Sequence, residues 1–258
     1  MDSTADKAIH LLGLHRDPTL LTVVNVWDVI SAQVVADTTG TTALATASHS
    51  IAASYGYEDG ENIPVELMIE AVGRIAAAVD LPVSADLEGG YGNAAETVRR
   101  AIGVGIVGAN IEDQMRPLAE AATQVEEIMA AADEEGIDFV LNARTDAFVK
   151  AGDRDPAEVL ADAVERGKAY LAAGAPTVFV PGRLDEHQVT TLVDAYGPQR
   201  LTLIGVPGSL SLARLEELGV ARVSYGPISQ RVALTALQEF VEEIHRGGVV
   251  PEGTRPLN

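Results

Sequence analysis

The chain of 258 residues contains no cysteine, which excludes disulfide bonds, thiolate metal sites and a cysteine nucleophile. Lysine is nearly as scarce. Of the 18 basic residues only Lys7, Lys150 and Lys168 are lysines, and none of them lies in a predicted strand. Because the lysine of a Schiff-base mechanism is usually desolvated within a strand, this composition argues against that mechanism.

Positive charge is sparse overall, since 38 acidic residues face 18 basic ones and the formal net charge is −20. The phosphate backbone of a nucleic acid repels such a protein, so we expect no nucleic-acid partner. The chain also lacks an apolar run of membrane-spanning length, and residues 1–6 are polar and acidic, unlike a signal peptide. We therefore expect a cytoplasmic protein that does not bind a membrane.

A repeated strand–helix pattern runs through the rest of the sequence. Eight short apolar runs are predicted as strands, at residues 20–26, 43–47, 82–86, 107–112, 138–143, 177–180, 201–206 and 222–225. Eight such units predict a single (β/α)8 TIM barrel over residues 1–246, followed by a Gly/Pro-rich tail over residues 247–258. A doubly wound open sheet is the alternative, but no G-x-G-x-x-G motif follows the first strand.

Helices are predicted between the strands, and a leading helix precedes them within residues 1–18. One of them is expected to start at Asp155-Pro156, with Asp155 as the cap and Pro156 at the first helical position. The last predicted helix spans residues 228–245, and one of its faces is apolar. This apolar face suits packing either on the helix's own barrel or on a neighbouring subunit. It is formed by Val232, Leu234, Leu237, Val241 and Ile244.

Two acids follow the third predicted strand, within the segment PVSADLEGGYG at residues 82–92. Asp86 and Glu88 stand two positions apart, so on an extended strand both carboxylates point to the same side. Such a pair at a rigid strand end is what a hard cation such as Mg²⁺ requires. The alternative is a helix cap beside a solvated acid.

The neighbouring strands end in polar residues of matching chemistry. Glu112 ends the fourth strand, and Asn142, Arg144 and Asp146 alternate at the end of the fifth. Since adjacent strands lie about 4.8 Å apart, these side chains and Asp86 are expected in one row. Carboxylates beside one arginine suit a metal and a small anionic substrate, because a guanidinium binds a carboxylate through two hydrogen bonds. A structural ion-pair network is the alternative for Arg144.

The remaining candidates carry weaker signals. Trp27, the only tryptophan, ends the first strand; it is interpreted mainly as a packing residue at the barrel mouth and is kept among the candidate substrate contacts. Four histidines are interpreted as surface residues, namely His10, His15, His187 and His245.

Several segments in this order resemble the isocitrate lyase/phosphoenolpyruvate mutase superfamily. They are NVWDVISAQ, TASHSIA with Asp59 beyond it, SADLEGGYG, NIEDQ, LNARTDAF and VSYGP, and the resemblance covers about residues 20–245. It implies a (β/α)8 barrel whose eighth helix is exchanged between subunits, usually in a tetramer built from swapped dimers. It also implies Mg²⁺ and an enolate formed from a 2-oxo acid.

The resemblance implies roles for individual residues. Asp86 resembles the direct metal ligand, and Asp59, Glu88 and Glu112 resemble acids that hold the metal through water. Arg144 resembles the anchor of the substrate carboxylate. The backbone amides around Ala47 and Ser48 resemble the cradle for the other substrate oxygens.

The segment after the fourth strand departs from the superfamily pattern. The lyases carry a K-[KR]-C-G-H-type loop there, whereas this chain reads DQMRPLAEAAT and has no cysteine. The Lys and Asn of the mutase loop are also absent from residues 113–124. The catalytic acid or base is thus not identified, although Tyr91 or solvent is able to protonate an enolate.

Three functions remain open from the sequence. The leading hypothesis is a Mg²⁺-dependent lyase that cleaves or decarboxylates a small 2-oxo or 2-hydroxy acid. Carbon–phosphorus chemistry of the mutase or hydrolase kind is the second hypothesis. A non-catalytic barrel that binds a 2-oxo acid is the third.

Overall fold

The structure is a computed structural model that describes residues 3–257, so the ends of the predicted leading helix and tail, at Met1, Asp2 and Asn258, lie outside the described residues. Its strands form one parallel sheet in the order β1-β9-β8-β7-β6-β5-β4-β3-β2. The sheet closes because β1 pairs with β9 while β2 pairs with β3. The predicted (β/α)8 barrel is confirmed, and the alternative prediction of an open doubly wound sheet is wrong. The strands are β1 (Leu21–Val23), β2 (Asn25–Val26), β3 (Leu44–Thr46), β4 (Val83–Asp86), β5 (Gly108–Glu112), β6 (Val140–Arg144), β7 (Thr177–Phe179), β8 (Leu201–Ile204) and β9 (Arg222–Ser224).

The first predicted strand is divided into β1 and β2 at Val24, which corrects the single run expected over residues 20–26. The two halves serve different neighbours: β1 continues the ladder of β9, and β2 begins the ladder of β3. Periodicity does not reveal this break, because Val24 is as apolar and β-branched as the residues around it.

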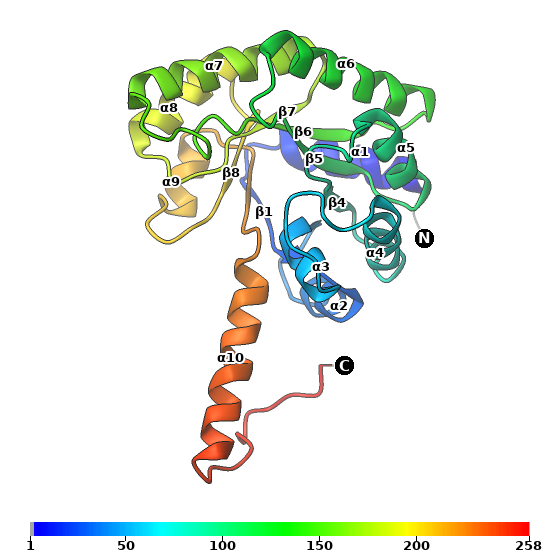
Figure 1. The fold of residues 1–258 in the computed structure, drawn as a ribbon, viewed down its shortest axis with the longest axis vertical. Helices are drawn as coiled ribbons and strands as arrows, with labels where there is room; N and C mark the ends of the chain where they lie inside the picture. The colour runs from blue at the N-terminus through cyan, green and yellow to red at the C-terminus, as the bar shows by residue number, and fades with distance from the viewer. Residues whose placement is uncertain (1–2, 258) are drawn as a thin grey trace.

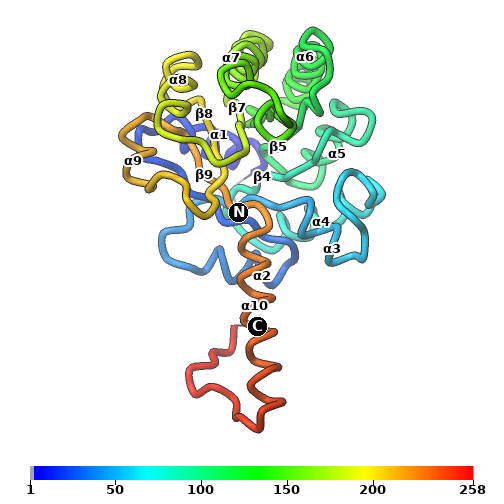
Figure 2. Tube along the Cα trace, turned by 60° about the vertical axis from the view of Figure 1, so that its left-hand side comes forward, coloured from blue at the N-terminus to red at the C-terminus, as the bar shows by residue number. Residues whose placement is uncertain are grey.

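Helices surround the strands (Figures 1 and 2). Helix α7 begins as the sequence predicts, because the Asp155 side chain accepts from the backbone N–H of Ala157 and Pro156 opens the first turn. The helices are α1 (Thr4–Arg16), α2 (Val29–Ala36), α3 (Ser48–Ser54), α4 (Val65–Ala77), α5 (Ala94–Gly103), α6 (Leu118–Glu134), α7 (Pro156–Ala172), α8 (Glu186–Tyr196), α9 (Leu212–Glu217) and α10 (Ile228–His245).

Helix α1 packs against the barrel and buries His15, which is only 1% exposed. The expectation of a surface histidine is wrong because His15 shares the buried face of the helix with Ala8 and Leu11, at helical spacing. Burial and the nearby Arg222 lower the pKa of His15 to about 3. The ring is therefore neutral, and its Nδ1–H donates to the Leu11 carbonyl oxygen at 2.9 Å.

Helix α10 leaves the barrel and projects away from it, with the tail folding back beside it (Figure 1). Only Gln230 near its start is buried, where the side-chain amide donates to the Ser50 carbonyl oxygen at 3.1 Å. The predicted apolar face exists, but it does not pack on the helix's own barrel. Its exposed apolar residues are Val232, Leu234, Leu237, Phe240, Val241 and Ile244. Within residues 3–257, no helix is long and apolar enough to cross a membrane.

We propose that a second copy of the chain covers this face, because a stripe of exposed large apolar side chains is costly in water. Light scattering at micromolar concentration is expected to show a dimer or larger assembly. Leu237→Glu with Val241→Glu should shift the protein to monomer, and the matched surface change Glu239→Gln should not. A wild-type protein that stays monomeric at high micromolar concentration would contradict the exchange.

Candidate active site

The end of β6 carries an arginine held between two carboxylates. Glu112 and Arg144 are paired in register on β5 and β6, and Arg144 Nη1 lies 2.9 Å from Glu112 Oε2. On its other side Arg144 Nε donates to Asp146 Oδ1 at 2.8 Å. Burial acts to lower the pKa of Arg144, but Glu112, Asp146 and Asp86 raise it further, so the net shift is upward. These contacts use Nε and Nη1, and Nη2 has no hydrogen-bond partner among the described residues.

Asp86 ends β4 beside this pair, and its carboxylate is held from the start of α3. Asp86 Oδ2 accepts from the backbone N–H of Ser48 at 3.1 Å and from its hydroxyl at 2.8 Å. The backbone N–H of Ala47 donates to the Val26 carbonyl oxygen at 3.3 Å. Both amides expected to cradle substrate are therefore already bonded within the protein, and the Ser48 amide serves to hold the carboxylate of Asp86.

Glu88 lies beside Asp86, but not for the reason that strand alternation suggested. Strand β4 ends at Asp86, and Glu88 takes a left-handed backbone with φ 52°. Its carboxylate is 4% exposed and accepts from the Tyr91 hydroxyl at 3.0 Å and from the backbone N–H of Glu61. Glu61 in turn accepts from the backbone N–H of Tyr91 at 2.5 Å. The sequence reading missed Glu61, whose only signal is its place after the Asp59-Gly60 turn.

Unusual backbone conformations gather at this end of the barrel. Six described non-glycine residues have a positive φ, and all except Gln199 lie in the loops after β3, β4 and β5. Such conformations cost free energy and persist where the surrounding contacts enforce them, often at functional sites. They are Glu61, Glu88, Tyr91, Gln114 and Met115.

Glu88 and Glu112 carry raised pKa values. Burial raises the pKa of Glu88 to about 7, against its hydrogen bonds from Tyr91 and Glu61, and the charges of Asp86 and Asp59 add to the rise. Burial also raises the pKa of Glu112 to about 7, although Arg144 acts in the opposite direction. Burial is the main cause of both shifts, and the nearby acids add to them, so negative charge gathers at this end of the barrel around Arg144. We call Asp86, Glu88 and Glu112 the acidic cluster.

The acidic cluster fits a hydrated Mg²⁺ rather than a fully coordinated metal. Within residues 3–257 no three acidic or histidine side chains converge closely enough to ligate one ion directly. Mg²⁺ commonly takes one or two carboxylates and keeps several waters. Asp86 Oδ1 and Glu112 Oε1 carry no protein hydrogen bond among the described residues and are the oxygens open to such an ion. Asp59 is exposed, but its charge reaches Glu88.

The short loop after β5 is hydrogen-bonded to the loop after β4. A Cβ on Gly89 would lie 2.3 Å from Gln114 Nε2, so any larger residue would displace the Gln114 side chain. Arg116 Nη2 donates to Gln114 Oε1 at 2.8 Å, and its Nη1 binds Gln124. Gln124 Nε2 donates to the Gly89 carbonyl oxygen at 3.0 Å. This loop forms one side of the site, and side-chain hydrogen bonds join it to its neighbours.

Asp113 anchors the same loop from behind and is 3% exposed. Its Oδ2 accepts from the Tyr170 hydroxyl at 2.6 Å and from Arg166 Nη1 at 3.2 Å. Its Oδ1 accepts from the backbone N–H groups of Met115 at 2.9 Å and Asp146 at 3.1 Å. Asp113 thus fixes the backbone of Asp146, whose carboxylate holds Arg144. It is the aspartate of the NIEDQ segment, to which the sequence alone assigned no role.

Neither Asn142 nor Trp27, both kept as candidate substrate contacts, has a hydrogen bond to the acidic cluster among the described residues. Asn142 is 0% exposed and donates to Asn110 Oδ1 at 2.7 Å, within the barrel below Arg144. Trp27 is partly exposed and lines a small cleft with Tyr55 and Arg74, between α2, α3 and α4. The first supports the site from below, and the second packs beside the mouth.

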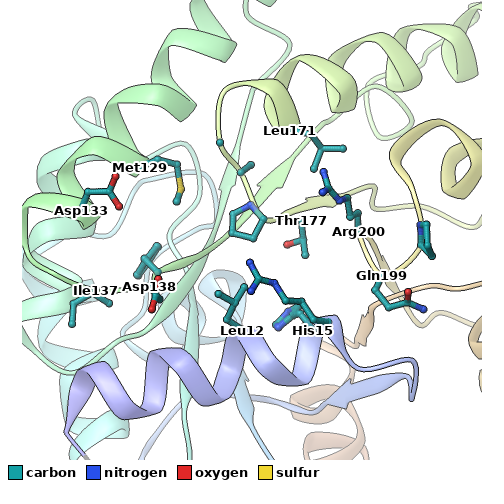
Figure 3. Close-up of a pocket in the computed structure, with 16 residues that line it drawn as sticks. Leu12, His15, Met129, Asp133, Ile137, Asp138, Leu171, Thr177, Gln199 and Arg200 are labelled. Atoms are coloured by element: carbon teal, nitrogen blue, oxygen red, sulfur yellow. The ribbon is translucent and has the colours of Figure 1, made fainter.

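A wide cleft of about 530 Å³ opens at the opposite end of the barrel, at the amino-terminal ends of β6, β7 and β8. Figure 3 shows Asp133 and Asp138 on one side of it, Arg200 on the other, and His15 below. Active sites of this fold lie at the carboxyl ends of the strands. This cleft is therefore separate from the candidate active site.

A family model described as phosphoenolpyruvate phosphomutase matches residues 11–245. The chain belongs to the isocitrate lyase/phosphoenolpyruvate mutase superfamily. A 2-methylisocitrate lyase of Shewanella oneidensis is 30% identical over 240 residues, covering 84% of this chain and 79% of that protein. An oxaloacetate decarboxylase of Rhodopseudomonas palustris is 28% identical and covers 88% of each chain.

A solved structure supports the same membership. A Burkholderia cenocepacia protein, provisionally assigned as a phosphonomutase, is 41% identical with a TM-score of 0.86, covering 92% of this chain and 99% of that one. The superfamily resemblance noted in the motifs is confirmed. The named relatives are lyases, decarboxylases and mutases of small acids, so membership alone leaves several reactions open for this chain.

Asp113 offers a direct test of how the site is supported. Asp113→Ala is expected to lower the free energy of unfolding by about 1–3 kcal/mol, because the buried Tyr170 hydroxyl and Arg166 Nη1 lose their acceptor, while Asp162 still pairs with Arg166 Nε. Urea unfolding measures this change. The exposed Asp153→Ala should stay within about 0.5 kcal/mol of wild type. A similarly small loss in Asp113→Ala would show that the network does not hold the loop.

Proposed function

We propose that this protein is a Mg²⁺-dependent lyase that acts on a small 2-oxo or 2-hydroxy acid through an enolate. The main support for this proposal is the position of Arg144 at the end of β6. There it is paired with Glu112 and Asp146 and lies next to the acidic cluster. This arrangement places one guanidinium beside Asp86 and Glu88, neither of which is paired with a basic side chain among the described residues. It suits an anionic substrate only if a cation is bound as well.

The chain's own residues divide the work of binding. Arg144 Nη2 binds the substrate carboxylate, while Glu112 and Asp146 keep the guanidinium in one orientation. Asp86 and Glu112 would hold the metal directly or through water, and Glu88 and Asp59 would act through water. When bound there, Mg²⁺ supplies a positive charge that stabilises negative charge developing on the substrate oxygens.

Proton transfer has a narrower set of candidates. Burial, together with the charge and hydrogen bond of Glu88, raises the pKa of Tyr91, so its hydroxyl stays protonated and donates to Glu88. The Tyr91–Glu88 pair or solvent then protonates the enolate carbon, a role filled in the lyases by a loop thiol that this chain lacks.

Because the loop after β5 is held by hydrogen bonds, we favour a reaction that does not require a mobile loop to close over the site. Decarboxylation of an oxaloacetate-like acid requires no base, because loss of CO₂ itself generates the enolate. Relatives of both kinds, a decarboxylase and a carbon–carbon lyase, support this range. We place the protein in the cytoplasm and expect no partner beyond its substrate and its own subunits.

Two other functions make different predictions. Carbon–phosphorus chemistry is favoured by the 41% identical relative, but the Lys and Asn of the mutase loop are missing. A binding barrel without activity requires only the Arg144 site.

A substrate panel with Mg²⁺ separates the three functions. We expect turnover of oxaloacetate or a 2-methylisocitrate-like acid, followed by release of a 2-oxo acid or CO₂. Turnover of phosphonopyruvate alone would favour the mutase or hydrolase reading. Binding without product across the panel would contradict an enzymatic role.

The metal assignment rests on Asp86. Asp86→Ala should abolish Mg²⁺ binding in calorimetry and retain the fold by circular dichroism, because it removes the open oxygen of the acidic cluster. Glu88→Ala should weaken binding less, since both Glu88 oxygens already accept protein hydrogen bonds. Asp153→Ala is the matched acid control. Unchanged Mg²⁺ affinity in Asp86→Ala would refute the site.

The role of Arg144 as the substrate anchor is tested by a substitution that keeps its positive charge and removes its planar guanidinium. Arg144→Lys should weaken oxalate or pyruvate binding by about 1–3 kcal/mol, because lysine cannot bind Glu112, Asp146 and a carboxylate in one plane. Arg74→Lys, an exposed change on α4, serves as control. Equal affinity in Arg144→Lys would mean that Arg144 is only a structural ion-pair partner.

A further inference from the structure

The strands of the barrel bury an unusually polar set of side chains, where this fold generally carries Val, Ile and Leu. Asn142 is its hub: it contacts Asn110, and its Oδ1 accepts from the hydroxyls of Thr177 at 3.1 Å and Thr202 at 2.6 Å. Arg222 is the only charged member of the set. The set, each residue 5% exposed or less, is Asn25, Thr46, Ser84, Asn110, Asn142, Thr177, Thr202, Arg222 and Ser224.

Arg222 extends across the barrel interior. It lies on β9 in register with Thr202 of β8, yet its Nη1 contacts Ser84 Oγ at 3.1 Å on β4. These strands are not neighbours in the sheet, so the side chain spans the interior. Ser84 stands two residues before Asp86, on the same side of the same strand. The guanidinium therefore lies below the acidic cluster.

The charge of Arg222 has no close counter-ion. Within residues 3–257 no carboxylate lies within 4.0 Å of it, and its Nε and Nη2 have no hydrogen-bond partner. A buried cation in this state costs several kcal/mol unless another charge offsets it. His15 nearby is neutral and does not help. Burial lowers the pKa of Arg222 to about 10, and Asp86 acts in the opposite direction, so the side chain is charged at pH 7.

We propose that Arg222 is the internal counter-charge of Asp86, and that it tunes how tightly the acidic cluster holds a divalent cation. It stabilises the cluster when no metal is present and opposes the metal when one binds, since both cations act on the same carboxylate. Coupling of this kind is reciprocal. Arg222 is thus a positioning residue that acts through Asp86 and touches no substrate. The metal half of the proposal rests on the proposed function.

A double-mutant cycle tests the Arg222–Asp86 pairing without any metal. In urea unfolding with EDTA, Arg222→Met should lower the folding equilibrium constant about tenfold more in wild type than in the Asp86→Asn background. Ser84→Ala, which removes the hydrogen bond and keeps the charge, should show no such dependence on Asp86. Additive effects of Arg222→Met and Asp86→Asn would overturn the pairing.

Mg²⁺ titration of the same variants tests the tuning. Arg222→Met should bind Mg²⁺ about tenfold more tightly than wild type, as expected for removal of one charge in the partly screened interior. Ser84→Ala and Arg222→Lys should stay near the wild-type affinity. A purely structural arginine predicts weaker or unchanged binding in Arg222→Met, which would refute the tuning.

The controls separate this proposal from the proposed function. If Arg222→Met does not fold, the neutral but polar Arg222→Gln carries the same two expectations. A wild-type protein that does not bind Mg²⁺ contradicts the proposed function and the tuning, while the metal-free cycle still decides whether Arg222 and Asp86 are paired.

Discussion

The candidate site depends on the placement of Arg144 between Glu112 and Asp146. The parallel register of β5 and β6 sets Glu112 opposite Arg144, and Asp113 fixes the backbone of Asp146 from behind. A guanidinium held on two sides presents its remaining donor in one direction, which lowers the entropic cost of binding a carboxylate. The other charged side chains beside Arg144 are acids, and they outnumber this one arginine.

Two unusual features of the barrel accompany this concentration of charge. Its interior is polar where most such barrels are apolar, and five residues around the mouth adopt left-handed backbone conformations. Both features cost stability and are retained in folds mainly where they serve a site. The fixed loop after β5 adds a wall in the place where lyases of the superfamily carry their catalytic loop. Together these features give a mouth that is crowded with charged side chains and held by hydrogen bonds.

Much of the fold was predictable because it depends on patterns that a sequence displays directly. Apolar runs alternating with amphipathic helices located the strands, and Asp155-Pro156 located the start of α7. The acids at strand ends followed from the same pattern. Glu88 was found for an incorrect reason, since strand spacing does not reveal a left-handed turn. Glu61, the engaged Ser48 amide and the buried His15 were missed, because loop packing and tertiary contacts decide where those groups lie.

If this mouth stabilises an enolate, as we propose, it should accelerate hydrogen exchange at the methyl group of pyruvate. Pyruvate in D₂O, incubated with the protein and Mg²⁺, should lose its methyl proton signal in NMR spectra faster than in buffer with Mg²⁺ alone. The acceleration should disappear when EDTA is added, because the negative charge on the enolate oxygen is then no longer offset. Pyruvate that binds to the protein but exchanges at the buffer rate would contradict the account.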